Sequence, residues 1–285
     1  MIKTFKYFLQ ALLLYFSLIF GKVIGLKLSR KLFSFIFLYI APSFKSKKII
    51  KKNLALFKKD LTEFEQKEII SNMWKNYGMT FVEYVYLDVF RKSNSHVKVI
   101  GNNILDKIIK SGRPVIFVSG HFANYELMSM EITKNNIKLA TIYRPLNNFF
   151  INPLMEYLRK KYVCRNQIKK GINGVREAIE YIKNDHSIAL MIDQRVSEGE
   201  QLNFFNHPAL TTTLPAQLAL KYNLIIIPVF IERTTHNNFI LEFQTEINPN
   251  NYKNKLELSI KLNEVLEKMI LKNPNEWIWT HNRWK

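Results

Sequence analysis

The sequence predicts an α/β fold in which a mostly parallel central sheet is flanked by helices and preceded by an N-terminal membrane-anchoring helix. Three observations lead to this expectation. Short apolar runs typical of buried strands end abruptly in polar side chains, helix-like segments separate these runs, and a long uncharged stretch lies near the N-terminus. A chain of 285 residues with 47% hydrophobic content is large enough to bury one core.

The middle of the chain carries the strand and helix signals in alternation. The expected strands are residues 115–119, 138–143 and 187–192, and the expected helices between them are 127–134, 152–161 and 174–183. Such alternation requires crossover connections, so these strands should be parallel. Further expected elements are two amphipathic helices over 45–89, a helix over 213–222, strands over 224–231 and 239–243, and a long helix over 253–271.

The N-terminal region combines apolar and basic residues. Residues 7–21 carry no charge, and at about 1.5 Å per residue this run covers roughly 22 Å, against roughly 30 Å of hydrocarbon in a bilayer. The run therefore either spans the membrane or embeds in it. Residues 1–59 hold twelve Lys and one Arg with no acidic residue before Asp60, out of a net charge of +19. We expect a membrane anchor over 1–30 and a catalytic domain over 31–285, on the cytoplasmic side because the cations follow the apolar run.

His121 and Glu126 are the expected catalytic pair. His121 follows the first strand, and neutral imidazole can accept a proton near pH 7 while a carboxylate stabilises the imidazolium. Five positions on a helix correspond to about 140° around its axis, so the two residues cannot share one helix face. His121 is therefore expected in the loop and Glu126 one turn into the next helix.

Two further strands also end in polar residues. Arg144 follows the second strand and Asp193 follows the third. Ligands of open α/β sheets bind outside the carboxyl ends of the strands, so His121, Arg144 and Asp193 are expected around one crevice. Taken singly, Arg144 also reads as a solvated loop cation and Asp193 as a turn or helix cap.

Several function classes lack their signatures in this sequence. The spacing of Cys and His residues offers no metal site, and a Gly-rich phosphate loop or dinucleotide fingerprint is absent, so no metal or cofactor is expected. The basic charge would suit nucleic acid, but no recognition motif accompanies it. The single cysteine, Cys164, lacks a histidine nearby in sequence, and no serine sits in a nucleophile elbow, so direct transfer is favoured over a covalent intermediate.

Six segments in order make the chain resemble the lipid A biosynthesis acyltransferases. They are residues 120–126 (GHFANYE), 143–145 (YRP), 193–194 (DQ), 204–205 (FF) with 211–213 (TTT), 228–230 (PVF) and 276–285 (EWIWTHNRWK). The resemblance covers essentially the whole chain. The chain departs from the pattern at Leu214 and Pro215, where the family often has glycine after the threonines.

The resemblance implies a glycerol-phosphate-acyltransferase-like fold and a specific reaction. An acyl thioester, on acyl carrier protein or coenzyme A, would acylate a hydroxyl of a phosphorylated glycolipid at the inner membrane, with no cofactor. His121 would be the general base and Glu126 its partner. The residues expected to bind substrate are Asn124, Arg144, Asp193, Gln194, Arg195, Thr212 and Thr213.

Some alternatives stay open at the level of sequence. The oxyanion of the tetrahedral intermediate could be bound by Arg144, by Arg195 or by backbone N–H groups after His121. An acyltransferase for phosphatidylinositol mannosides, and a lipid-binding membrane protein without catalysis, fit the same fold. The tryptophans at 277, 279 and 284 suit either a membrane interface or packing against the sheet edge.

Overall fold

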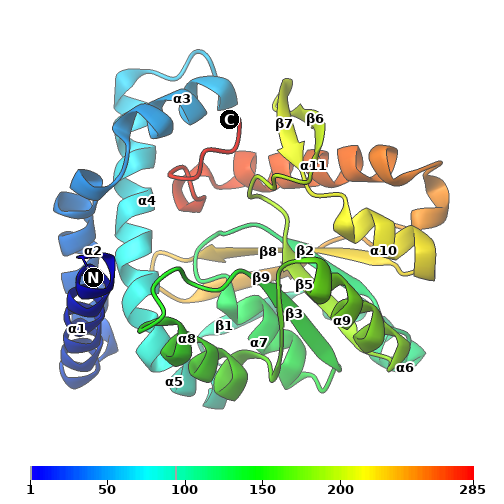
Figure 1. Cartoon of the computed structure of the whole chain (residues 1–285), viewed down its shortest axis with the longest axis horizontal. Coiled ribbons are helices and arrows are strands. Elements are labelled where there is room, and N and C mark those ends of the chain that lie inside the picture. Colours follow the sequence, from blue (N-terminus) through cyan, green and yellow to red (C-terminus); the bar gives the residue numbers. More distant parts are fainter. Residues whose placement is uncertain (1, 94) are drawn as a thin grey trace.

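A seven-stranded sheet forms the centre of the protein (Figure 1). The structure is a computed structural model, and it describes residues 2–93 and 95–285. The strand order is β1-β9-β8-β2-β5-β3-β4. Every neighbouring pair is parallel except β8 and β9, which confirms the predicted mostly parallel sheet. The strands are β1 (Val97–Ile100), β2 (Ile116–Ser119), β3 (Leu139–Tyr143), β4 (Asn166–Lys169), β5 (Ser187–Met191), β8 (Ile226–Arg233) and β9 (Phe239–Phe243).

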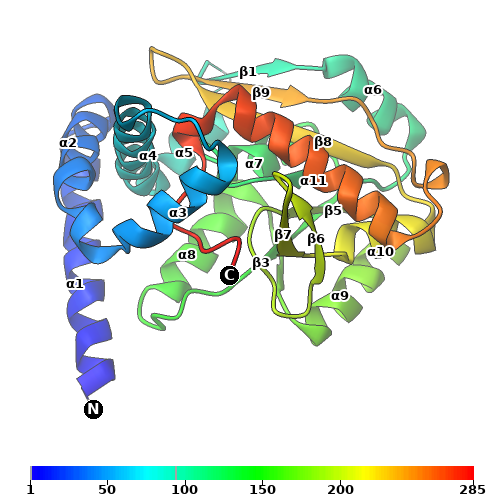
Figure 2. The ribbon, with the colours of Figure 1, turned by 90° about the horizontal axis from the view of Figure 1, so that it is seen from above.

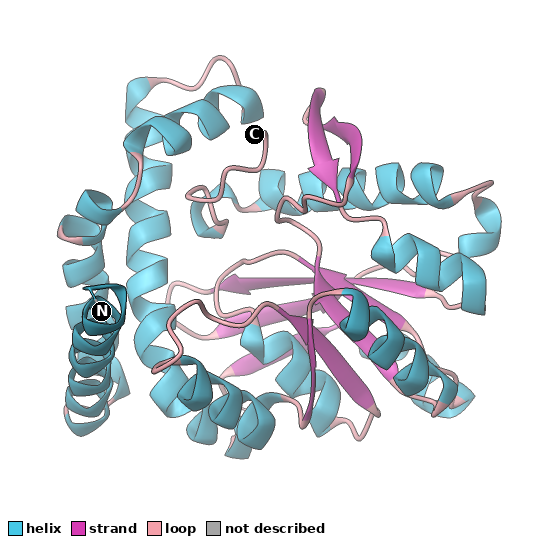
Figure 3. Cartoon of the chain, in the orientation of Figure 1, coloured by secondary structure: helices cyan, strands magenta, loops and turns pink. Residues whose placement is uncertain are grey.

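Helices cover both faces of this sheet (Figures 1 and 3). In two perpendicular views α11 lies across one face, and α7 lies under the other (Figures 1 and 2). The helices of this part of the chain are α6 (Asn102–Ser111), α7 (Glu126–Lys134), α8 (Asn152–Leu158), α9 (Ile172–Lys183), α10 (Leu214–Tyr222) and α11 (Lys255–Lys272). A small antiparallel hairpin of β6 (Glu200–Phe204) and β7 (His207–Thr211) stands apart from the main sheet.

Five helices form the N-terminal part: α1 (Ile2–Val23), α2 (Leu26–Tyr39), α3 (Lys47–Phe57), α4 (Glu63–Glu83) and α5 (Leu87–Lys92). By length and composition α1 could cross a membrane. A turn at Gly25, with a positive φ of 81°, separates it from α2, which packs along α4. The expected anchor boundary at residue 30 therefore falls inside α2. Residues 45–89, expected to form two helices, contain α3, α4 and the start of α5.

Local sequence signals explain where these helices start. The Ser46 hydroxyl accepts a hydrogen bond from the backbone of Ile49 and caps α3. Thr62 and Glu65 form a reciprocal capping box at the start of α4. The period of the apolar residues predicted helices in this region, and these caps add the positions at which α3 and α4 begin.

The core lies on both sides of the sheet. All four residues of β2 are buried, as expected for a strand covered by helices on both faces. Trp277 and Trp279 are fully buried, and Trp284 is 6% exposed. Of the two readings of these tryptophans, the structure therefore shows packing inside the protein.

Candidate active site

The sheet places His121 beside Asp193. In the register of the neighbouring parallel strands β2 and β5, Ser119 lies opposite Met191. His121 and Asp193 each follow their strand partner by two residues, so they leave the sheet at the same level. The Nδ1 atom of His121 lies 2.8 Å from Oδ1 of Asp193.

Three donors hold the Asp193 carboxylate, which is completely buried. Besides the imidazole, the backbone N–H of His121 donates to Oδ2 at 2.8 Å, and the indole N–H of Trp277 donates to the same oxygen at 3.0 Å. Gly120 is required for this approach because an added Cβ would lie 3.3 Å from Oδ2 of Asp193 and 2.7 Å from the ring of Phe122. The carboxylate is fixed in one orientation.

These contacts determine the tautomer of His121. Burial raises the pKa of Asp193, but the charge of His121 and the hydrogen bonds from His121 and Trp277 outweigh it, and the pKa lies below its usual value. Asp193 is therefore ionised at neutral pH and accepts a hydrogen bond from Nδ1. The Nε2 atom of His121 is left with a lone pair, which is the form of imidazole that can remove a proton.

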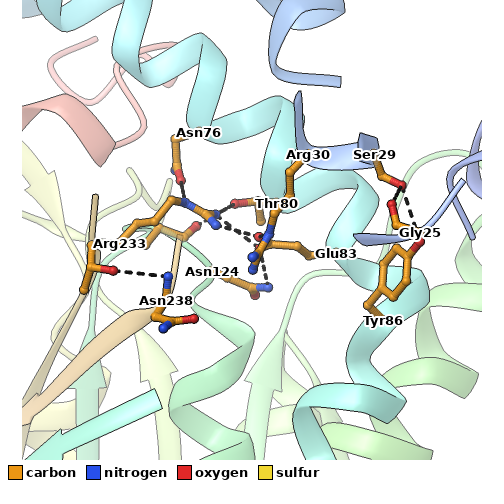
Figure 4. Close-up of polar contacts among 12 residues, drawn as sticks. Gly25, Ser29, Arg30, Asn76, Thr80, Glu83, Tyr86, Asn124, Arg233 and Asn238 are labelled. Carbon is orange, nitrogen blue, oxygen red and sulfur yellow. Dashed lines mark hydrogen bonds and ion pairs between the residues drawn. The ribbon is translucent and has the colours of Figure 1, made fainter. Parts of the chain in front are cut away.

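Helix α4 braces the loop that carries His121. Ala123 has a positive φ of 41°, an uncommon conformation for a residue with a side chain, and its carbonyl accepts a hydrogen bond from the hydroxyl of Thr80 at 3.0 Å. The Nδ2 of Asn124 donates to Glu83 Oε2 at 2.9 Å (Figure 4). Asn124, expected to bind substrate, is buried and supports the loop.

Glu83 is the centre of a buried ion network (Figure 4). Its carboxylate accepts from Arg30 Nε on α2 at 2.7 Å and from Arg233 Nη1 at the end of β8 at 2.5 Å. Burial raises the pKa of Glu83, but the two arginines outweigh it and the pKa lies below the usual range. The network joins the N-terminal helices to the sheet and to the His121 loop.

Glu126 is not the hydrogen-bond partner of His121. Its Oε1 accepts from the Tyr84 hydroxyl at 2.6 Å and from Arg159 Nε and Nη2 at 2.8 and 2.5 Å. From the sequence, Glu126 is expected one turn into the helix that follows His121, whereas the structure has it as the first residue of α7. The carboxylate of Glu126 forms an ion pair with Arg159, a residue to which the sequence analysis gave no role. The place expected for Glu126, on the imidazole, is occupied by Asp193.

Arg159 owes its position to an irregular helix end. The helix expected over 152–161 ends as an α-helix at Leu158 and continues as a π-helical turn, Arg159–Val163. Burial lowers the pKa of Arg159, but the charge of Glu126 outweighs it and raises the pKa above its usual value. The guanidinium is thus a permanent cation beside the site. Hydrophobic periodicity does not distinguish such a turn from a regular helix end.

A cavity of about 570 Å³ opens beside His121. Six of the nine expected site residues line it: His121, Glu126, Arg144, Gln194, Arg195 and Thr212. Asn124, Asp193 and Thr213 do not, since the first two support the loop and the histidine, and the Thr213 hydroxyl accepts a hydrogen bond from Gln217 in α10. The lining cations are Lys45, Arg144, Arg159, Lys170 and Arg195. Glu126 is the only carboxylate among the described lining residues, so the cavity carries net positive charge.

The cavity offers arginine donors for an anion. Two backbone N–H groups of the His121 loop are already used, because His121 donates to Asp193 and Phe122 donates to the Gly120 carbonyl. The Nε of Arg195 is buried without a hydrogen-bond partner among the described residues. An unsatisfied buried guanidinium nitrogen favours an acceptor from a ligand.

Sequence reasoning missed other residues that support the site. His281 Nε2 accepts a hydrogen bond from the backbone N–H of Arg195 at 2.9 Å, and burial lowers its pKa. Trp277 contacts Asp193 from the same C-terminal segment. Both lie more than 80 residues from their partners, beyond any local pattern.

Burial raises the pKa of Cys164 to about 11, so its thiol is protonated at neutral pH and is a poor nucleophile.

These features point to a class of enzyme. A histidine held in one tautomer by a buried carboxylate, beside a cation-lined cavity at the carboxyl ends of parallel strands, suits an enzyme that transfers a group to a hydroxyl.

Comparison with known proteins identifies the family. Residues 2–285 match the family described as bacterial lipid A biosynthesis acyltransferase. The chain is 23% identical over 263 residues to the lipid A biosynthesis acyltransferase of Haemophilus influenzae, covering 89% of this chain and 82% of that protein. It is also 23% identical to the lipid A biosynthesis lauroyltransferase of Escherichia coli, over 84% of this chain and 78% of that protein.

One solved structure aligns with this chain at a low TM-score. The 1-acyl-sn-glycerophosphate acyltransferase PlsC from Thermotoga maritima aligns with a TM-score of 0.42 at 16% identity, covering 90% of this chain and 99% of that one. The protein belongs to the bacterial lipid A biosynthesis acyltransferase family and is an acyltransferase.

Proposed function

We propose that this enzyme transfers a fatty acyl chain from an acyl carrier protein thioester to a hydroxyl of a phosphorylated lipid A precursor, with His121 as general base. The observation that carries the proposal is the 2.8 Å contact between His121 Nδ1 and Asp193 Oδ1 beside a cation-lined cavity. It leaves Nε2 free to act on a hydroxyl. Family membership supplies the class of acceptor.

The reaction follows from the geometry of His121. Nε2 removes the proton of the acceptor hydroxyl as its oxygen attacks the thioester carbonyl carbon, a contribution of about 10²- to 10⁴-fold. The tetrahedral intermediate then collapses, the C–S bond breaks, and the thiolate takes the proton back from the imidazolium. Asp193 stabilises the imidazolium between these two steps and is a positioning residue.

Arginine side chains are the proposed oxyanion donors. Arg195 has a buried Nε with no partner among the described residues, and Arg144 lines the same cavity. Preorganised donors of this kind commonly make the largest single contribution to acyl transfer. In this proposal Glu126 holds Arg159 at the cavity wall, and Asp193 takes the role beside His121 that the sequence analysis expected of Glu126.

The positive charge of the cavity supports the proposed substrates. Five lining cations suit the phosphate of a glycolipid, and a chain with net charge +19 suits an acidic carrier protein. Association with an acidic carrier should weaken with salt because the attraction is screened. An acyl-coenzyme A thioester carries negative charge only on its few phosphate groups, so its binding should depend less on salt.

The N-terminal region supports attachment to a membrane. We propose residues 1–30 as the anchor and 31–285 as the catalytic domain, at the cytoplasmic face of the inner membrane. The helix α1 is apolar, and the Lys-rich region beyond it would attract anionic lipids.

The experiment is mass spectrometry of a tetra-acylated lipid A precursor incubated with the purified protein and mixed acyl carrier protein and coenzyme A thioesters. The two kinds of donor carry acyl chains of different length, so one added acyl chain supports the proposal and its mass reveals the donor. His121→Ala should lose turnover and keep membrane attachment. Unchanged precursor with the native protein, or full activity of His121→Ala, would contradict the proposal.

A further inference from the structure

The loop between β3 and α8, residues 144–151, lies beside α1 and away from the centre of the sheet (Figures 1 and 2). It includes Arg144, Pro145, Leu146 and Asn147, all of which line the cavity beside His121. The same loop exposes apolar side chains to solvent, since Leu146 is 43% exposed and Phe149 is 54% exposed. One segment therefore contacts both the site and the surroundings of α1.

Polar contacts fix this loop to α1 at Tyr7 and Tyr15. Asn148 Nδ2 donates to the Tyr7 carbonyl at 2.9 Å, and the Tyr15 hydroxyl donates to the Phe150 carbonyl at 2.6 Å. Asn148 is only 8% exposed, and both hydrogen bonds are partly buried.

Aromatic side chains also join this loop to α1. The ring of Phe149 lies 6.0 Å from that of Tyr7, and the ring of Phe150 lies 5.7 Å from that of Phe8. The loop and residues 7–15 of α1 thus form one packed unit.

The face of α1 that points away from the loop is apolar and has no packing partner among the residues that the structure describes. Its exposed large side chains are Ile2, Phe5, Leu9, Leu12, Leu13, Phe16, Ile19, Phe20 and Val23. Lys3 and Lys6 lie at one end and Lys22 at the other. An apolar helix face flanked by cations suits a bilayer with anionic head groups.

Contacts of α1 with the rest of the protein extend along most of its length. They run from Tyr7, beside Asn148, to Lys22, whose ammonium lies 2.9 Å from Asp88. At about 1.5 Å per residue this is roughly 22 Å of helix. Whatever orientation α1 takes in the membrane, the loop must sit at the same depth as residues 7–15.

We propose that residues 146–150 enter the bilayer together with α1 and form the lip over which a lipid passes into the cavity. Its partner is the surface of a bilayer containing anionic phospholipids, with Phe149 and Leu146 among the acyl chains. The identity of the arriving lipid rests on the proposed function, but insertion of the loop does not.

Single tryptophan substitutions at exposed positions test the insertion. The variants are Phe149→Trp in the loop, Leu9→Trp on α1 and Ile109→Trp on α6, a helix on the far side of the molecule from α1 in Figure 2. Each full-length protein is bound to phosphatidylglycerol-containing vesicles whose acyl chains are brominated at different depths. Bromine quenches nearby indoles, and the native tryptophans, all buried, provide the background to be subtracted.

The expected result is that Phe149→Trp and Leu9→Trp are quenched with the same depth profile while Ile109→Trp is unaffected. Quenching of Leu9→Trp without Phe149→Trp would overturn the proposal, as would equal quenching of all three or of none. A protein that inserts but lacks acyl transfer would contradict only the proposed function.

A second measurement uses vesicle binding. Changing both Leu146 and Phe149 to Asn should weaken binding by about tenfold or more, because two apolar side chains lose their insertion. Ile109→Asn is the matched control and should bind as the native protein does. Equal binding by the double variant would overturn the proposal.

Discussion

Asp193→Asn separates the observed His121–Asp193 pair from the expected His121–Glu126 pair. Oδ2 of Asp193 accepts from two N–H groups, those of His121 and Trp277, so the amide oxygen of Asn must occupy that position. The amide NH₂ then faces His121 Nδ1, in the place of Oδ1. Since NH₂ can only donate there, Nδ1 must become an acceptor, the proton moves to Nε2, and the base is lost.

The size of the expected loss of activity in Asp193→Asn follows from the loss of the reactive tautomer of His121. In hydrolases with the same His–Asp arrangement, this exchange lowers kcat about 10⁴-fold, equivalent to about 5 kcal/mol of activation free energy. We expect a loss of about 10³- to 10⁴-fold in acyl transfer from acyl carrier protein, measured by mass spectrometry of the lipid product. Two of the three hydrogen bonds are kept, so the fold should survive, as thermal unfolding in detergent would verify.

Glu126→Gln is the matched comparison. Gln keeps an acceptor for the Tyr84 hydroxyl and removes the charge that holds Arg159. Its loss of turnover should be smaller than that of Asp193→Asn. The reasoning is refuted if Asp193→Asn keeps more than about a tenth of native activity, or if Glu126→Gln is the more damaging change.

Three further variants test other parts of the structure. Glu83→Gln leaves two buried arginines without their counter-charge and should lower the free energy of unfolding by about 3–5 kcal/mol in urea titrations. Burial raises the pKa of Glu276 from 4.5 to about 7. Between these two pH values the folded state binds one proton more than the unfolded state, so the free energy of unfolding falls as pH rises from about 4.5 to 7. The fall is roughly 1.4 kcal/mol per pH unit at most. Glu276→Gln should remove this pH dependence of the free energy of unfolding. Gly120→Ala would push a methyl against Phe122 and Asp193, so turnover should fall while vesicle binding is unchanged.

The sequence contained enough information for the sheet and for the place of the site. Strands β2, β3 and β5 are short apolar runs, and each is followed by a polar residue that the parallel arrangement brings to one edge. The hydrophobic pattern of each run predicts the strand, and the change from apolar to polar residues marks its end. Elements with weak patterns were missed, among them β1, α6, β4 and the β6–β7 hairpin, because short amphipathic segments resemble loops in sequence.

The pairing of charges was beyond local reasoning. Glu126 is five residues from His121 and Asp193 is seventy-two, yet the distant residue makes the contact. Strand register brings Asp193 close, and register is a property of the assembled sheet. Arg159 and Trp277 were missed for the same reason, since a π-helical turn and a buried C-terminal segment position them.

The equal two-residue extension of His121 and Asp193 beyond paired strands has a consequence for divergence within the family. Neighbouring strands keep a spacing of about 4.8 Å whatever side chains they carry, so the separation of imidazole and carboxylate is inherited from the main chain. Packing residues within the strands can therefore change without moving the pair, as long as the strand register is kept. The number of residues between the end of each strand and the site residue must, by contrast, stay the same. Deleting one residue between β5 and Asp193 would turn the carboxylate to the other side of the strand, whereas many substitutions within β5 would leave it in place.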